Sequence, residues 1–333
     1  MTEILIDHTL KTQLDPAKFR DPKRTAKGDQ RASVALRELE TLWFNTGTLC
    51  NIECVNCYIE SGPANDRLAY LTTDDARQYL DEIAELGLGT SEIGFTGGEP
   101  FMNPDILEMI ELALARGFEA LVLTNAMRPM QRPRIKQGLM ELNRRHGAAL
   151  TLRVSLDHYS RALHEAERGA NTYQPTIEGI DWLVSNGFAI NIAGRTCWGE
   201  DEADARAGYQ RLAAERGWPV DAANQAELVL FPEMDDGAEV PEITTECWSI
   251  LGVDPGAMMC ASSRMVVKAR GAGHAHVVPC TLLPYDPQFN MGATLGRSLE
   301  ADGGAFDHGK VRLNHPHCAK FCVLGGGSCS AAG

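Results

Sequence analysis

The chain has 333 residues, of which 44% are hydrophobic and 23% charged, and its formal net charge is -14. This length suits one large α/β domain with a smaller one, and the composition is typical of a globular protein. The negative charge argues against nucleic acid as a partner, because binding a phosphate backbone requires a basic face. No stretch reaches the roughly 18 to 20 apolar residues of a membrane span, and the first residues lack the plan of a signal peptide. We therefore expect a cytoplasmic protein without a membrane partner.

Residues 1–39 carry charge runs and little periodicity, so we expect an extension that wraps the domain or is partly disordered. From residue 40 the pattern becomes regular, and short apolar runs typical of strands alternate with helical patterns up to residue 235. The predicted strands lie at 41–46, 92–96, 119–124, 149–155, 188–195 and 227–231.

The predicted helices between these strands have recognisable ends. Capping residues at 72–75 precede a helical pattern that runs to Leu86 and is stopped by Gly87. Pro104 opens a second helix over 105–116, and a third covers 176–185. Six strand and helix alternations predict a parallel sheet covered by helices, with reactive groups at the carboxyl ends of the strands.

Three of the ten cysteines lie close together, as Cys50, Cys54 and Cys57 in the run C-N-I-E-C-V-N-C-Y after the first predicted strand. Cysteines in a cytosolic chain are more often metal ligands or reactive thiols than disulfides. A structural zinc or a fully ligated cluster takes four protein ligands, so a group of three indicates an iron–sulfur cluster with one open iron. A zinc knuckle or unrelated buried thiols are the alternatives.

This spacing resembles the CxxxCxxC signature of the radical S-adenosylmethionine (SAM) enzymes, and Gly97-Gly98-Glu99-Pro100 resembles the GGEP element of that family. The resemblance implies an α/β fold, a partial (βα)6 TIM-like barrel, over residues 40–235. It also implies a [4Fe-4S] cluster on the three cysteines, with SAM bound at the fourth iron. Reductive cleavage of SAM would then give a 5′-deoxyadenosyl radical.

The same resemblance implies the residues that bind SAM. Gly97 and Gly98 would let the backbone approach the cofactor, and the Glu99 carboxylate would receive the methionine ammonium. Strand ends supply three further candidates, Asn125, Ser155 and Arg195, the last for the methionine carboxylate. A capping or loop hydrogen bond is the alternative role for these three.

Two positions near the motif raise separate questions. Family members usually carry an aromatic residue just before the third cysteine, where this chain has Asn56, and Tyr58 is the nearest aromatic able to contact adenine. The segment 163–169 also resembles the family, without a catalytic role. Cys197 stands alone after Arg195, either as a hydrogen-atom donor to a substrate radical or as a small buried hydrophobe.

Residues 236–333 are rich in glycine and cysteine and resemble the SPASM or twitch extension, which holds auxiliary iron–sulfur clusters. Because a closed cluster takes four ligands, we expect at least one auxiliary [4Fe-4S] cluster. A second cluster with an open site or a histidine ligand (His315 or His317) and a zinc site are the alternatives. The best-spaced ligand set is Cys260, Cys280, Cys318 and Cys322, with Cys247 and Cys329 as possible substitutes.

The resemblance implies hydrogen abstraction from a small-molecule or peptide substrate, giving oxidation, cyclisation or epimerisation, with electrons from a flavodoxin- or ferredoxin-type reductant. An amino-terminal leader-binding domain is not recognisable, which favours a small molecule or a peptide that docks independently. The alternatives are a non-catalytic iron–sulfur carrier or sensor on the same fold, which Asn56 would suit, and a zinc-binding interaction module.

Overall fold

The computed structural model describes residues 13–232, 237–300, 306–307 and 309–325. Its main sheet has eight strands in the order β7-β6-β5-β4-β3-β2-β8-β9, and a second sheet has the order β1-β11-β10. The strands are β1 (Ser33–Val34), β2 (Thr41–Asn45), β3 (Glu92–Thr96), β4 (Glu119–Thr124), β5 (Leu150–Ser155), β6 (Ala189–Arg195), β7 (Leu228–Phe231), β8 (Ser263–Val267), β9 (His276–Val278), β10 (Phe306–Asp307) and β11 (Lys310–Arg312).

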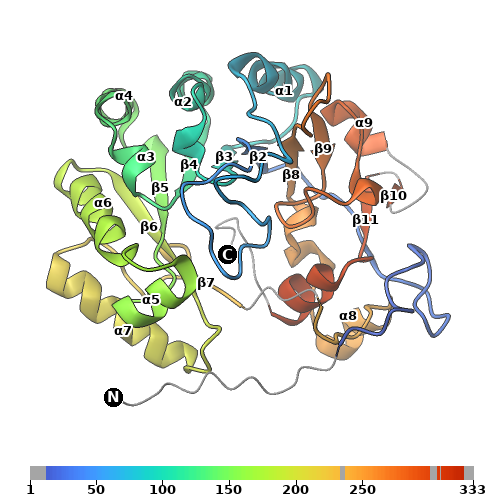
Figure 1. Ribbon diagram of the computed structural model, residues 1–333. Helices are drawn as coiled ribbons and strands as arrows, with labels where there is room; N and C mark the ends of the chain where they lie inside the picture. Colours follow the sequence, from blue (N-terminus) through green and yellow to red (C-terminus); the bar gives the residue numbers. More distant parts are fainter. Residues whose placement is uncertain (1–12, 233–236, 301–305, 308, 326–333) are drawn as a thin grey trace.

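Helices cover the outer face of the curved sheet, so the six strands β2 to β7 form an α/β partial barrel (Figure 1). The α-helices are α1 (Thr73–Leu86), α2 (Ile106–Leu114), α3 (Arg128–Gln131), α4 (Pro133–His146), α5 (Arg161–Arg168), α6 (Tyr173–Ser185), α7 (Glu202–Arg216), α8 (Cys247–Leu251) and α9 (Leu295–Glu300). No helix in the described part of the chain is long and apolar enough to cross a membrane.

The six predicted barrel strands are all present and all parallel. Their register brings the strand ends to one rim: Asn45 pairs with Thr96, and Arg195 pairs with Phe231. Since parallel strands expose their carboxyl ends together, the loops that follow them can form one site. Figure 1 shows the loop after β2, in blue, extending toward the centre of the partial barrel.

Local sequence explains where α1 begins and ends. The Thr72 hydroxyl accepts a hydrogen bond from the backbone N–H of Asp75, and the Asp75 side chain accepts one from Thr72, which completes a capping box. Gly87 ends the helix in the left-handed conformation. The inner face of α1 packs on the sheet, where Phe44 stacks on Phe95 at 5.8 Å and meets Tyr79 edge-on.

The main sheet continues past the domain boundary predicted at residue 235. β8 pairs in parallel with β2, with Leu42 opposite Arg264, and β9 adds an antiparallel edge. The segment before the barrel packs on the C-terminal part, because β1 pairs with β11 and the buried Arg31 forms an ion pair with Glu242 at 2.5 Å. The described part of the predicted extension, from residue 13, is therefore joined to residues after 236.

Candidate active site

A cavity of roughly 1010 Å³, counting its open mouth, lies at the carboxyl ends of the barrel strands. Nine of the residues predicted to bind a metal or SAM line it: Cys50, Cys54, Cys57, Tyr58, Gly97, Gly98, Asn125, Ser155 and Arg195. Twelve further residues line it, and five of them, which were not predicted as site residues, bear on its chemistry: Asp157, Arg168, Phe231, Leu282 and Phe321. Two of these, Leu282 and Phe321, come from the C-terminal part, which therefore supplies one wall of the cavity.

The three motif cysteines lie in the loop that follows β2. Cys50 is buried, whereas Cys54 and Cys57 are partly buried. Burial raises the pKa of the Cys50 thiol to about 12 and that of Cys54 to about 11. At neutral pH these side chains are neutral thiols, so a bound metal must offset the loss of their protons before they can serve as thiolate ligands.

The two glycines after β3 allow this turn to touch the start of the cysteine loop. Gly97 has φ of 142°, and a Cβ built there would lie 2.5 Å from the carbonyl oxygen of Gly47. A Cβ on Gly98 would lie 2.3 Å from the carbonyl oxygen of Leu49, the residue before Cys50. Any side chain would push the two loops apart. The glycines thus line the cavity and also fix the position of the loop.

Glu99, the residue predicted to receive the methionine ammonium, lies behind the cavity wall. It is 2% exposed and, like Pro100, is not among the residues that line the cavity. Its carboxylate accepts hydrogen bonds from the Thr124 hydroxyl and the Asn125 backbone N–H, both at 2.9 Å, and from the Phe101 N–H at 3.2 Å. Burial raises the pKa of Glu99 to about 6 although these bonds lower it. In this structure the carboxylate joins the ends of β3 and β4 through these hydrogen bonds.

Charged side chains of opposite sign meet at the ends of β5 and β6. Arg168 Nε donates to Asp157 Oδ2 at 2.6 Å, and Arg195 Nε lies 3.4 Å from Asp157 Oδ1. Burial pushes the pKa of Asp157 up, but the two arginines outweigh it and hold that pKa below its ordinary value. Arg195 donates through Nη2 to the Asn56 carbonyl at 3.2 Å, while its buried Nε and Nη1 have no hydrogen-bond partner.

Asn56 and Cys197 both lie outside the set of cavity-lining residues. The Asn56 side chain turns toward Glu167 and donates to Oε2 at 2.7 Å. Cys197 is partly buried, and burial raises its pKa to about 11. The hypothesis that Cys197 donates a hydrogen atom to a substrate therefore has no support from the cavity as it stands.

A second, smaller cavity, of about 360 Å³ with the solvent at its mouth included, lies in the C-terminal part. The four cysteines predicted as an auxiliary set all line it: Cys260, Cys280, Cys318 and Cys322. His317 lines it too, with an otherwise apolar wall. All four thiols are buried, and burial raises the pKa of Cys260 to about 11. Among the described side chains, no three His, Cys, Asp or Glu groups converge on a single metal ion.

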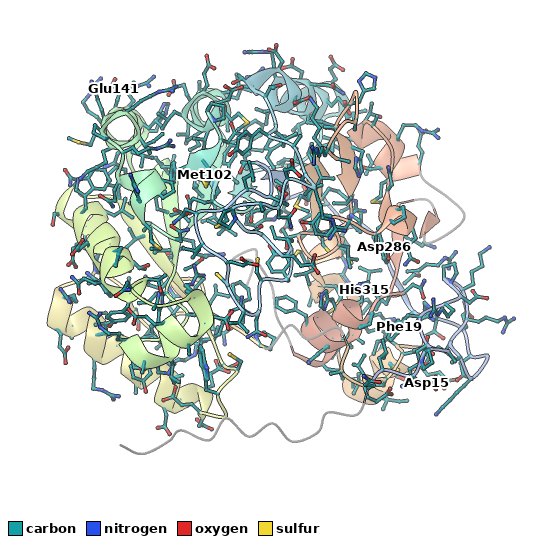
Figure 2. The ribbon with its side chains drawn as sticks, in the orientation of Figure 1. Asp15, Phe19, Met102, Glu141, Asp286 and His315 are labelled. Carbon is teal, nitrogen blue, oxygen red and sulfur yellow. The ribbon has the colours of Figure 1, made fainter. Side chains whose placement is uncertain are left out.

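The other candidates of this region lie elsewhere. Cys247, on α8, accepts hydrogen bonds from Thr244 and does not line the smaller cavity. His315 does not line it either, although its ring lies 4.8 Å from that of His317. Cys329 lies outside the described residues. Figure 2 shows His315 and Asp286 on the C-terminal half of the molecule, opposite Glu141 on α4.

A comparison with protein families explains this arrangement. Residues 44–204, which contain the three motif cysteines and the strand ends β2 to β6, match the model of the Radical SAM superfamily. Residues 44–204 therefore carry a radical SAM domain. Members of this superfamily bind a [4Fe-4S] cluster and SAM, so the predicted family, fold and cofactor class are confirmed.

Curated relatives match less than half of the chain. The AdoMet-dependent heme synthase of Methanosarcina barkeri is 30% identical over 147 residues, covering 43% of this chain and 38% of the relative. The bacteriocin biosynthesis protein AlbA of Bacillus subtilis is 26% identical over 145 residues, covering 43% and 30%. The mycofactocin maturase MftC of Mycobacterium ulcerans is 27% identical, covering 42% and 35%. The chain thus spans about a third of the length of these relatives.

Solved radical SAM structures share the fold. SuiB of Streptococcus suis bound to S-adenosylmethionine superposes with a TM-score of 0.57 at 13% identity, covering 79% of this chain and 66% of that one. The structure of anSMEcpe with bound AdoMet gives a TM-score of 0.56 at 14% identity, covering 79% and 77%. Because these matches extend well beyond residues 44–204, the C-terminal part takes part in the likeness of fold.

Proposed function

We propose that this radical SAM protein is an enzyme that cleaves SAM reductively and abstracts hydrogen from an organic substrate. When bound at Cys50, Cys54 and Cys57, the [4Fe-4S] cluster supplies the electron that breaks a carbon–sulfur bond of SAM and yields the 5′-deoxyadenosyl radical. The observation that carries the proposal is the convergence of these cysteines with Gly97 and Gly98 on one cavity. Three ligands leave one iron for SAM.

The chain's own residues fit SAM at this cavity. Arg195 presents a buried Nη1 with no hydrogen-bond partner, beside an Nε that Asp157 approaches only at 3.4 Å. A carboxylate such as that of the methionine moiety would satisfy the free donor. Tyr58 lines the cavity with an aromatic ring, whereas the Asn56 side chain turns toward Glu167, which supports Tyr58 as our candidate for the adenine contact.

The C-terminal part fits a second cluster. Four buried cysteines line one cavity with an otherwise apolar wall, and four thiolates complete the coordination of a [4Fe-4S] cluster. We assign Cys260, Cys280, Cys318 and Cys322 to it. Leu282 lines both cavities, and Phe321, between the last two cysteines, lines the larger one. An electron leaving a substrate in the larger cavity would cross this wall to reach the auxiliary centre.

We infer that the substrate is a peptide. Part of the cavity wall is apolar: Phe231 stacks on Phe321 at 5.8 Å, and Leu282 lines the same cavity. This part of the wall would hold a hydrocarbon side chain while excluding water. Relatives named for bacteriocin biosynthesis and mycofactocin maturation, and a SuiB structure bound to the precursor peptide SuiA, favour this class. A small molecule is the second candidate substrate, because one relative is named as a heme synthase.

Label transfer tests this proposal. Anaerobic protein with SAM, a reductant and a peptide library deuterated at side-chain carbons should return deuterium in 5′-deoxyadenosine, and the labelled residue would identify the site attacked. A Phe231→Ala variant should still cleave SAM but lose transfer from the substrate. Transfer from deuterated small molecules, with none from any peptide, would favour the second candidate.

A further inference from the structure

Arg264 on β8 is a fully buried arginine with no carboxylate partner among the described side chains. Its Nη1 donates to the carbonyl oxygens of Cys260 and Ser263, both at 2.7 Å, and its Nη2 donates to the carbonyl of Gly309 at 2.9 Å. Its buried Nε has no hydrogen-bond partner. Carbonyl dipoles solvate the guanidinium but do not neutralise its charge.

Two other arginines with buried or nearly buried side chains, Arg31 and Arg168, form ion pairs with carboxylates. Arg31 lies 2.5 Å from Glu242, and Arg168 lies 2.6 Å from Asp157. A buried charge without a counter-ion is costly, and proteins normally compensate it. The contrast therefore requires a source of negative charge near Arg264 that the described carboxylates do not provide.

The cysteines of the smaller cavity can supply this charge. Arg264 Nη1 donates directly to the backbone carbonyl of Cys260, which brings its charge beside the cysteines of this cavity. As neutral thiols, the cysteines would leave Arg264 uncompensated. As ligands of a [4Fe-4S] cluster, four thiolates and the cluster core carry a net negative charge, which a buried cation stabilises. Arg264 does not line the cavity, so it would act through its field and not as a ligand.

We propose that Arg264 is the counter-charge of the auxiliary centre and raises its reduction potential. The inference rests on the auxiliary cluster assigned above. One-electron reduction adds a negative charge to that cluster, and a fixed positive charge in a medium of low dielectric stabilises the reduced form more than the oxidised form. Arg264 thereby makes the auxiliary cluster a better acceptor of an electron from the substrate side.

An anaerobic redox titration of the full-length, iron-loaded protein, followed by electron paramagnetic resonance, tests this role. The signal that changes on adding SAM belongs to the cluster at Cys50, Cys54 and Cys57, and the SAM-insensitive signal belongs to the auxiliary cluster. Arg264→Gln removes the charge but keeps a donor, whereas Arg264→Lys keeps the charge. At the parent's midpoint potential, Arg264→Gln should lower the ratio of reduced to oxidised auxiliary cluster at least tenfold, about 59 mV for one electron.

Arg264→Lys should change that ratio less than threefold. The SAM-sensitive cluster serves as an internal standard, because neither variant should shift its midpoint potential. An auxiliary potential unchanged in Arg264→Gln would overturn the role of Arg264 and leave the cluster in place. No SAM-insensitive signal in the parent would instead overturn the auxiliary cluster itself. If Arg264→Gln does not fold, Arg264→Lys tests the proposal alone. A tenfold change in its ratio of reduced to oxidised auxiliary cluster, with the positive charge retained, would contradict the role of that charge.

Discussion

Glu167 holds Asn56 with both oxygens of its carboxylate. Oε1 accepts the backbone N–H of Asn56 at 2.9 Å, and Oε2 accepts its side-chain amide at 2.7 Å. The backbone carbonyl of Glu167 also accepts the N–H of Val55 at 2.9 Å. The loop between the second and third motif cysteines is thereby fastened to α5. An asparagine before Cys57 has a structural reason, which removes the one feature that favoured a non-catalytic carrier.

Asn56→Ala should loosen the cysteine loop. It leaves the buried Glu167 without its side-chain donor, at a cost of about 1 to 3 kcal/mol in the free energy of unfolding. We expect SAM affinity to fall about tenfold, since each 1.4 kcal/mol changes an affinity by that factor. Equilibrium dialysis of SAM on the iron-loaded variant measures it. The matched control is Asn143→Ala, because the Asn143 amide donates to the carbonyls of Asn186 and Gly187 and none of the three lines the cavity. An equal loss of SAM affinity in both variants would contradict the role of the Glu167 contact.

Gly98→Ala should displace the loop that carries Cys50. The new Cβ would lie 2.3 Å from the Leu49 carbonyl oxygen, and overpacking of this kind costs about 1 to 3 kcal/mol. We expect less iron bound per chain and weaker SAM binding. Gly273→Ala is the control, because nothing lies within 4 Å of the Cβ it would add. Normal iron content and SAM affinity in Gly98→Ala would show that the close approach of the two loops is dispensable.

Glu99 predicts a pH dependence of stability. Its pKa rises from 4.5 to about 6 on folding, mainly through burial, so the folded state binds more protons than the unfolded state between these values. Stability from this group is therefore greatest below pH 4.5 and is lost as the pH rises to about 6, by about 2 kcal/mol in total.

Urea unfolding at pH 5 and pH 7 checks this sign. Glu99→Gln cannot titrate, so it lacks this loss of stability. Relative to the parent, the variant should therefore have a higher free energy of unfolding at pH 7 than at pH 5. The variant also replaces one of the two acceptor oxygens by an NH₂ group, which lowers its stability at both pH values. A difference that does not change with pH would mean that Glu99 keeps an ordinary pKa.

Cys318→Ala should remove the auxiliary cluster and leave the SAM-binding cluster. We expect iron to fall from about eight to about four per chain, because each cubane cluster holds four irons. Cys247→Ala is the control, since its sulfur accepts hydrogen bonds from Thr244 and lies outside the cavity wall. Iron analysis decides the assignment. An equal loss in Cys247→Ala, or none in Cys318→Ala, would require a different ligand set.

The barrel and the cysteine loop were predictable because they depend on local patterns. Each barrel strand is a short apolar run, and α1 carries its capping box and terminal glycine in the sequence. β8 could not be predicted, because its partner β2 lies more than 200 residues away and only tertiary structure selects that pairing. The sequence also does not indicate which way a side chain at a strand end points.

Glu99 and Arg168 show why the site was only partly predictable. The family motif placed Glu99 beside the cofactor, but the ends of β3 and β4 offer its carboxylate three donors and draw it away from the cavity. Arg168 reaches the cavity from the end of α5 because Asp157 holds it there. The segment 163–169 was the only sequence signal for it, and that signal named no role.

The most direct test of the account is anaerobic quantification of 5′-deoxyadenosine from SAM and dithionite, comparing the parent with a Cys50→Ala/Cys54→Ala/Cys57→Ala variant. We predict release from the parent and none from the triple variant, while a Cys247→Ala protein behaves like the parent. Equal release from the parent and the triple variant, or no release from an iron-loaded parent at any substrate tested, would contradict reductive cleavage of SAM at this site.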